Sequence, residues 1–429
     1  MFLNRNERVA PRGWLASQAP ALAIALCAMF GSGPAQAGEV VEVEGVAHVR
    51  NGATPSGGVE TIELEELWRA GGDDDDVIFG LISRVLVDDD GTVYLLDTQL
   101  SEVKVFSPDG ELVKTLSREG DGPGETRSPT DMAFMPDGTI GLAQMFPGRI
   151  TKIDREGNPS GVIQVGGDPA SGGFSILRDL ECAGGNMVLC PTKVSQGERQ
   201  ATQIRTDQLA SYNEDGTEKV SYLEKEHFWD FTDFTLDEGD QYFVYFGRFA
   251  VGPTGQVVAA PERNSYALNV YDPAGDLLRV IEREYEPWKR NAEDMVRVEG
   301  AFAGAMRQFP FEIKTKIYET EPDINSLNFT DDGELWVVPS RGVREQPDGV
   351  MQTFDVFDTE GHFIKQVSVA CEGNGEDDAL IAAGDDRFIL VKGFVEALLM
   401  LQGGGAGEGE EEEEEESAPM EVICYSIRS

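Results

Sequence analysis

Histidine is nearly absent from this chain, with only three residues among 429. His48, His227 and His362 lie in different segments, so there is little material for a histidine metal site or a Ser/His/Asp triad. A GxSxG elbow, a Walker phosphate loop and a dinucleotide-binding glycine fingerprint are also missing. These absences argue against the common hydrolase and nucleotide-dependent classes, and we assign no catalytic residue from the sequence.

Cysteine is also scarce, with five residues, of which Cys27 lies near the N-terminus. Cys182, Cys190, Cys371 and Cys424 show no CxxC or Cys/His spacing, which argues against a zinc site. In an oxidising compartment these four residues can form disulfides, and buried free thiols are an equal alternative.

Basic residues are few: 35 Lys and Arg stand against 78 Asp and Glu, which gives a formal net charge of −43. Such a charge disfavours nucleic acid and anionic membrane surfaces, because proteins bind both through Lys and Arg. The charge either keeps the protein soluble in a salty exterior or attracts cations and basic partners.

Long apolar runs are missing beyond the N-terminus. Residues 21–30 are apolar, follow a basic start with three Arg, and precede the small-residue cleavage pattern Ala35-Gln-Ala37. The run is shorter than the ~20 residues that cross a bilayer. We therefore expect a signal peptide over residues 1–37, cleavage near Ala37, a periplasmic or secreted product and no membrane span.

What the chain does contain is a two-part repeat. An apolar run ends in Asp-Gly, and a second apolar run ending in Asp-Gly follows about twenty residues later. Each part is typical of two strands joined by a tight turn, in which Gly supplies a positive φ. The first part recurs at residues 85–97, 132–142, 180–190, 249–259, 327–337 and 380–390.

Two consecutive hairpins make a four-stranded antiparallel unit, which must stack on neighbouring units to bury its faces. Six copies predict an all-β fold, a six-bladed β-propeller that occupies residues 38–429 as a single domain. The last blade is one strand short, since 421–427 is the final apolar run. We expect residues 60–68 to supply the missing strand, because closure removes a free sheet edge.

A family resemblance follows from these residues. The segment Val93-Tyr-Leu-Leu-Asp-Thr-Gln-Leu-Ser-Glu-Val-Lys-Val-Phe-Ser-Pro-Asp-Gly110 resembles an NHL-type repeat. Residues 118–125, Arg-Glu-Gly-Asp-Gly-Pro-Gly-Glu, are similar to a connector of exported bacterial six-bladed propellers. The resemblance covers most of residues 38–429 and implies the fold, but no activity, because such propellers include binding modules, scaffolds and enzymes.

Within a blade, the a–b and c–d turns lie at one end of the sheet, and the b–c and d–a connections lie at the other. Long insertions fall almost entirely in the second set, at residues 193–206, 224–246, 282–323, 341–351 and 393–419. Binding residues concentrate on loops held by a rigid scaffold. We therefore expect the ligand site at the end that carries the b–c and d–a connections, which we call the long-loop face.

The ligand-binding candidates on this face are Trp229, Arg248, Arg149, Arg263 and Arg341. Trp229 belongs to an aromatic-rich insertion that either lines a pocket or forms a small core beneath a long loop. Arg149, Arg263 and Arg341 could hold a carboxylate bidentately, or they pair with acidic neighbours.

Another insertion, residues 291–308, is predicted as a helix between blades four and five. Asn291 can cap it, and its apolar stripe is typical of a helix that packs as a lid.

The innermost strands are expected to begin at the rim of the central channel, where Asp131, Asn325 and Asp378 stand. Ca²⁺ takes about six to eight oxygen ligands, so these side chains are candidate metal ligands, as in lactonase-like propellers. Ordinary capping of strand ends is the alternative.

Residues 403–419 include seven consecutive Glu and are predicted as a disordered acidic loop. The leading hypothesis is a monomeric, non-catalytic binding or scaffold propeller, with no cofactor required. It would recognise a protein, a peptide or a small polar ligand on the long-loop face. The alternative is a Ca²⁺-dependent lyase or lactone hydrolase at the channel mouth.

Overall fold

Turn sequences set the strand boundaries in the first sheet of the computed structural model. Strands β4 (Ile82–Val87) and β5 (Val93–Asp97) are joined by a turn in which Gly91 has a φ of 78°. In the same turn, Asp88 accepts hydrogen bonds from the backbone N–H groups of Asp90 and Thr92. A positive φ costs Gly little, which is why the apolar run reverses there. Strands β6 (Glu102–Phe106) and β7 (Leu112–Leu116) complete the antiparallel order β4-β5-β6-β7.

The structure describes residues 38–73, 76–166, 174–199, 201–307, 313–384, 386–401 and 419–428. The predicted signal peptide and nearly all of the predicted acidic loop lie outside these ranges. Among the described residues, no helix combines the length and apolarity that crossing a bilayer requires.

Each of the six predicted first parts forms an antiparallel pair that begins a group of four strands, and we number these groups in chain order as the first to the sixth sheet. Hydrogen bonding through β3 merges the fifth and sixth groups into one eight-stranded sheet. The second sheet contains β8 (Pro129–Phe134), β9 (Ile140–Gln144), β10 (Arg149–Ile153) and β11 (Pro159–Gln164). The third contains β12 (Phe174–Ala183), β13 (Asn186–Gln196), β14 (Thr202–Tyr212) and β15 (Glu218–Asp230). The fourth contains β17 (Phe249–Val251), β18 (Val257–Ala259), β19 (Ala267–Tyr271) and β20 (Leu277–Arg283). The fifth contains β22 (Ile324–Phe329), β23 (Leu335–Pro339), β24 (Val350–Phe357) and β25 (Phe363–Ala370). The sixth begins with β26 (Ala379–Ala382), β27 (Arg387–Lys392) and β28 (Glu421–Ile427).

The N-terminal strand expected at residues 60–68 belongs to β3 (Val59–Gly71), which pairs antiparallel with β28 as the outer strand of the sixth sheet. Its first residues also pair in parallel with β25, so β3 joins the fifth and sixth sheets. The hairpin of β1 (Glu39–Val43) and β2 (Val46–Asn51) extends the fourth sheet, with β2 parallel to β20.

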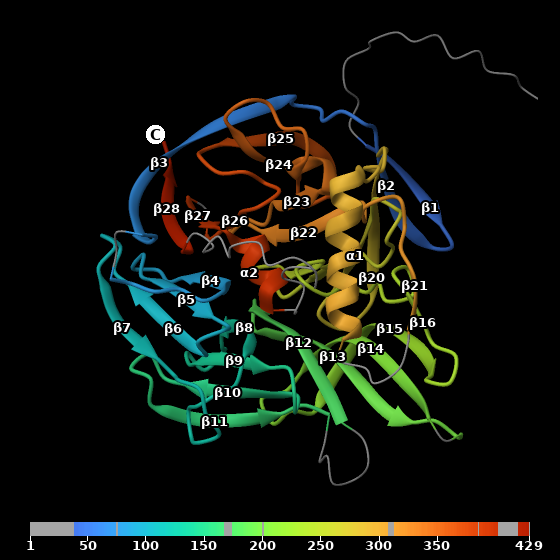
Figure 1. Ribbon diagram of the computed structural model, residues 1–429. Helices are drawn as coiled ribbons and strands as arrows, with labels where there is room; N and C mark the ends of the chain where they lie inside the picture. Colours follow the sequence, from blue (N-terminus) through green and yellow to red (C-terminus); the bar gives the residue numbers. More distant parts are fainter. Residues whose placement is uncertain are drawn as a thin grey trace, which may run out of the picture. The chain divides into compact units, whose positions relative to one another are not determined.

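Five apolar clusters lie between successive sheets, from the first and second to the fifth and sixth. A sixth cluster joins the sixth sheet to the first and includes Trp68 of β3, Phe106 of β6 and Val422 of β28. Each of these six groups of strands is therefore packed against two others through buried apolar side chains. In Figure 1 the colours follow this order of sheets along the chain.

Two predicted insertions are corrected by the structure. Residues 193–206 are largely strand, because β13 and β14 continue as a ladder in which Val194 is paired with Arg205 and Ser195 with Ile204. Likewise β15 reaches Asp230, so the insertion expected from residue 224 begins several residues later. Val194, Thr202 and Ile204, together with Phe228 and Trp229, supply β-branched and aromatic residues that favour strands in both stretches.

Two helices interrupt the sheets. The predicted helix is present as α1 (Ala292–Met306), where Asn291 accepts a hydrogen bond from Asp294 N–H and the Asp294 carboxylate accepts one from Asn291 N–H. This reciprocal pair satisfies N–H groups that the first turn leaves free. The second helix, α2 (Phe394–Leu401), corrects the expectation of a loop there, since its Leu, Ala, Glu and Met residues are good helix formers.

Candidate functional site

The long-loop face carries the described helices and the short parallel strand pair that are added to the sheets. Helix α2, helix α1, the 3₁₀ turn η2 (Ser340–Val343) and the parallel pair β16 (Thr235–Asp237) and β21 (Lys314–Lys316) lie in b–c or d–a connections. The described a–b and c–d turns are short. In Figure 1, α2 lies beside β4 and β26, on the side that faces the centre of the sheets. The insertions therefore share one end of the fold.

Exposed apolar side chains follow the same asymmetry. Among the described residues, the large exposed apolar side chains outside strands all lie in b–c or d–a connections: Ile78, Leu100, Phe146, Phe246, Val296, Met400 and Leu401. The others lie in outer strands, and none lies in a described a–b or c–d turn. Scattered exposed apolar residues are normal, but a one-sided set on connecting segments indicates a contact surface.

Three of these residues form what we call the α2 patch: Ile78, Met400 and Leu401, which are 74%, 51% and 45% exposed. Their chain neighbours Val77 and Leu398 pack against one apolar cluster, the one that joins the sixth sheet to the first. The two segments of the patch are therefore anchored on the same apolar cluster.

Acidic side chains border the α2 patch. Asp76 precedes Ile78, and Glu396 lies on α2 itself, both exposed. The connection before β26 carries Glu372 and Asp377, and Val395 N–H of α2 donates to the Asp377 carbonyl at 2.9 Å. The apolar patch thus lies beside negative charge.

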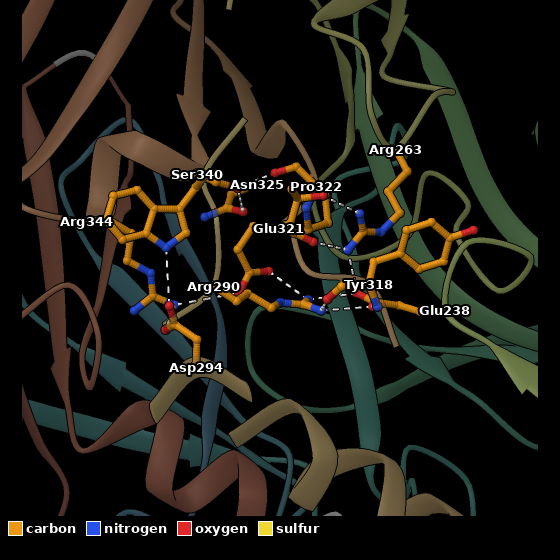
Figure 2. A network of polar contacts seen from close by, with 12 residues as sticks. Glu238, Arg263, Arg290, Asp294, Tyr318, Glu321, Pro322, Asn325, Ser340 and Arg344 are labelled. Carbon is orange, nitrogen blue, oxygen red and sulfur yellow. Dashed lines mark hydrogen bonds and ion pairs between the residues drawn. The ribbon is translucent and has the colours of Figure 1, made fainter. Parts of the chain in front are cut away.

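A network of ion pairs holds the long insertion after β20 (Figure 2). Glu238 accepts hydrogen bonds from Arg263 at 2.6 Å, from Arg290 at 2.7 and 2.9 Å, and from the Tyr318 N–H at 2.8 Å. Burial raises the pKa of Glu238, but the bonds from Arg290, Tyr318 N–H and Arg263 outweigh it and leave the pKa below its usual value. The carboxylate therefore stays charged although it is largely buried.

The same network continues to α1. Arg344 lies 3.3 Å from Asp294 and 3.9 Å from Glu321, which also pairs with Arg290 at 3.0 Å. Asp294 further accepts a hydrogen bond from the Trp288 indole N–H at 3.2 Å. Because both ends of the insertion are tied to the body, α1 is a fixed part of the long-loop face.

Trp229 is placed in a small core rather than in an open pocket. It is only 6% exposed, lies 4.4 Å from Phe234 between ring centroids, and carries the Arg205 guanidinium 3.4 Å from its own centroid. Ile313 belongs to the same cluster, and Met306 of α1 packs against it. This geometry agrees with the alternative in which the aromatic residues of the insertion form a small core beneath a long loop.

The four predicted arginines each bond to protein atoms. Arg149 donates to the Gln144 side chain at 2.9 Å, and Arg248 donates to the Ile324 and Tyr245 carbonyls, both at 3.2 Å. Arg263 pairs with Glu238 in the network of Figure 2. Arg341 donates to the Glu286 carbonyl at 2.6 Å and lines a cavity, which makes it the arginine of this set best placed for a ligand.

The candidate metal ligands also have protein partners. Asp131 accepts the Leu180 N–H at 2.8 Å, Asp378 accepts the Gly393 N–H at 2.8 Å, and the Asn325 side chain accepts the Ser340 hydroxyl at 3.0 Å. Capping and cross-linking of strand ends accounts for all three contacts.

Among the described residues, one group of three His, Cys, Asp or Glu has ligand atoms within 4.8 Å of one another. It consists of Asp358, Glu360 and His362 in a c–d turn, and it includes none of the predicted metal ligands. Asp358 there accepts the Glu360 and His362 N–H groups, both at 2.9 Å, as a turn residue does.

Sequence reasoning missed two carboxylates on β12. Asp179 accepts the Phe246 N–H at 3.2 Å, and burial, followed by the negative charge of Asp131, raises the pKa of Asp179 to about 7. Burial also raises the pKa of Glu181 to about 7, while Arg84 opposes the shift. The alternation Asp179-Leu180-Glu181 was the available signal, since it directs both carboxylates to one side of an innermost strand.

All four described cysteines are free thiols, which fits the buried-thiol alternative. Burial raises the pKa of Cys182 to about 12 and makes its thiolate rare at neutral pH.

No protein-family model matches this chain, and no curated protein matches it. Among solved structures, it is similar to a member of the DUF4221 family from Bacteroides vulgatus, with 12% identity, coverage of 86% of this chain and 99% of that chain, and a TM-score of 0.46. A protein from Bacteroides fragilis that is described as exported shares 9% identity, with 86% and 99% coverage and a TM-score of 0.45. A calcium-binding protein, regucalcin, from Agrobacterium tumefaciens shares 10% identity, with 86% and 97% coverage and a TM-score of 0.38. None of these similarities assigns an activity to the chain.

Proposed function

We propose that residues 38–429 form a six-bladed, NHL-like β-propeller that is exported and binds a partner protein through its long-loop face. The observation that carries this proposal is the one-sided exposure of apolar side chains on the b–c and d–a connections. A rigid scaffold that presents apolar side chains at one end, and turns of ordinary polarity at the other, is suited to docking rather than to solvent exposure.

The partner segment is cationic with apolar anchors. The α2 patch offers Met400, Leu401 and Ile78 as contacts, and the flanking charges of Asp76, Glu396 and Asp377 select for Lys or Arg around those anchors. The net charge of −43 adds long-range attraction for a basic partner and repels acidic ones. Export to the periplasm or the exterior follows from the predicted signal peptide.

Two substitutions test the patch directly. Met400→Glu with Leu401→Glu adds charge to exposed positions of α2 and should leave the melting temperature within a few degrees of wild type. The matched control is Val113→Glu, because Val113 is 59% exposed on β7, away from the long-loop face.

The probe is a synthetic amphipathic peptide of Lys and Leu, compared with its Glu/Leu counterpart and with oligolysine. We expect the Lys/Leu peptide alone to bind measurably by calorimetry. The α2 double variant should weaken that binding about tenfold or more, Val113→Glu should not, and binding should fall as salt rises.

Equal binding of the Lys/Leu and Glu/Leu peptides, or full binding by the α2 double variant, would remove this proposal. A Ca²⁺-dependent rise in melting temperature together with hydrolysis of a lactone probe would instead support the enzyme alternative. Concentration-dependent self-association that the double variant abolishes would make the patch a contact between two copies of this chain.

A further inference from the structure

A second site lies away from the α2 patch, between the fourth and fifth sheets on the long-loop face. A cavity of about 300 Å³ is lined there by residues from several distant segments: Ala53, Arg283, Glu284, Tyr285, Glu286, Pro339, Arg341, Gly342, Gln346, Thr353 and Gln366. This volume is at the lower end for small-molecule sites. We propose that the cavity binds a small carboxylate-bearing molecule, held between the guanidinium groups of Arg341 and Arg283.

The floor of the cavity is built and rigid. Arg283 forms a buried ion pair with Asp355, and Asp355 also accepts hydrogen bonds from the Tyr266 hydroxyl at 2.7 Å and the Gln366 amide at 2.8 Å. Arg283 donates to the Ala53 carbonyl at 3.2 Å as well. Its side chain is only 9% exposed, so the guanidinium is held in one place.

Arg283 retains unused donor capacity. Its Nε is buried, and no described residue accepts a hydrogen bond from it. A buried N–H without an acceptor costs free energy, which a hydrogen bond to a ligand oxygen would recover. The adjacent Gln366 amide is oriented by Asp355, which leaves its carbonyl oxygen as an acceptor for a ligand N–H or O–H.

Arg341 supplies the cation at the rim. Its backbone N–H donates to the Tyr285 hydroxyl at 3.0 Å, and its side chain lies over the Trp288 ring at 5.5 Å. The side chain is 38% exposed and donates through Nε to the Glu286 carbonyl, which fixes the plane of the guanidinium. An Arg with a fixed plane can receive a carboxylate through two parallel hydrogen bonds.

Glu286 is the competitor for this cation. Its carboxylate lies 3.6 Å from Arg341 Nη2 and is 87% exposed, so it is weakly held and easily displaced. A ligand carboxylate that replaces the Glu286 carboxylate makes the same ion pair with Arg341, but in a cavity that is less exposed to water. The site therefore predicts a preference for acids over the matching amides.

The test uses N-acetylglycine and N-acetyl-L-alanine as probes, with N-acetylglycinamide as the uncharged match. Titrations of protein labelled with ¹⁵N at arginine Nε should shift the Arg341 and Arg283 signals with the acids and not with the amide. Arg341→Gln should weaken acid binding about tenfold, which is the loss of one charge-assisted hydrogen-bonded contact. Arg199→Gln, an exposed arginine in the connection between β13 and β14 of the third sheet, should leave the affinity unchanged.

Two further variants sharpen the result. Glu286→Gln removes the competing carboxylate and should tighten acid binding a few-fold. Arg341→Lys keeps the charge without the bidentate geometry, and should weaken binding while the melting temperature stays near that of wild type.

The inference is overturned if acid and amide bind equally, if Arg341→Gln or Arg341→Lys leaves the affinity unchanged, or if millimolar probe shifts neither arginine signal. Because the α2 patch variants do not touch this cavity, failure here leaves the proposed partner surface standing, and the reverse also holds.

Discussion

The indole of Trp68 on β3 stacks on the ring of Phe106 on β6, with centroids 5.1 Å apart and an angle of 14° between the planes. These residues belong to the sixth and first sheets, and both are buried in the cluster that joins those sheets. The stacking therefore joins β3, the outer strand of the sixth sheet, to the second hairpin of the first sheet.

The turn beside Trp68 makes this closure testable. A Cβ at Gly110, where φ is 84°, would lie 2.4 Å from Trp68 Cβ, whereas a Cβ at Gly138, where φ is 83°, would meet no described atom within 4 Å. Both substitutions to Ala cost about 1–2 kcal/mol of left-handed backbone strain. We expect Gly110→Ala to lower the free energy of unfolding by about 1–3 kcal/mol more than Gly138→Ala, as measured by urea denaturation. Equal losses would show that β3 does not pack on this turn.

A second prediction concerns pH. Asp179 and Glu181 have pKa values of about 7, above the values near 4 of unfolded chains. The folded state thus holds these protons more tightly, so their stabilising contribution is complete below about pH 4 and is lost as the pH rises through 7. Relative to wild type, Asp179→Asn with Glu181→Gln should gain about 1–3 kcal/mol of stability per carboxyl between pH 5 and pH 8, measured by chemical denaturation at each pH. A constant difference between the two proteins across this range would contradict the assignment.

A third prediction concerns the ion-pair network of Figure 2. Glu238→Gln leaves the buried guanidinium groups of Arg290 and Arg263 without their shared carboxylate. Removing one partner of a buried pair costs about 3 kcal/mol. The control is Lys314→Gln, whose pair with Asp233 is exposed at both ends and should change stability by less than about 0.5 kcal/mol. Thermal melts of both variants check this, and similar melting temperatures would contradict a stabilising role for the network.

A fourth prediction tests whether Trp229, in the aromatic insertion, is a buried core residue or a ligand-contact residue. Trp229→Ala removes a buried ring and should cost about 3–5 kcal/mol, whereas Phe228→Ala alters a neighbour that is 57% exposed and should cost less than about 0.5 kcal/mol. Denaturant unfolding monitored by circular dichroism measures both. A small effect of Trp229→Ala would return this residue to the ligand-binding candidates.

Much of the local structure could be read from the chain. The Asp-Gly turns, the six first parts and the strand at residues 60–68 were visible because hairpins depend on nearby residues, above all on Gly with positive φ. Asn291 and the apolar spacing after it likewise predicted α1, since capping and helix periodicity are local properties.

The site could be read only in part. Arg341 was a candidate from its place in a connection, but its partner Arg283 lies at the end of a strand and reaches the same cavity only through the packing of two sheets. Trp229 looked like a ligand contact because aromatic composition is the same in a pocket and in a small core. The extension of β13 and β14 was missed because a long insertion between strands reads alike as a loop or as a longer hairpin.

The sequence by itself determined the hairpins of the repeat and their tight turns, because these depend on residues a few positions apart. Only the tertiary structure decided which charges meet: Glu238 with Arg290, Arg283 with Asp355, and Asp131 with the backbone of Leu180. Those pairs join residues from different sheets or connections, and their distances are set by how the sheets pack. The pKa values of Asp179 and Glu181 follow from the same packing, because burial and neighbouring charge are properties of the folded molecule alone.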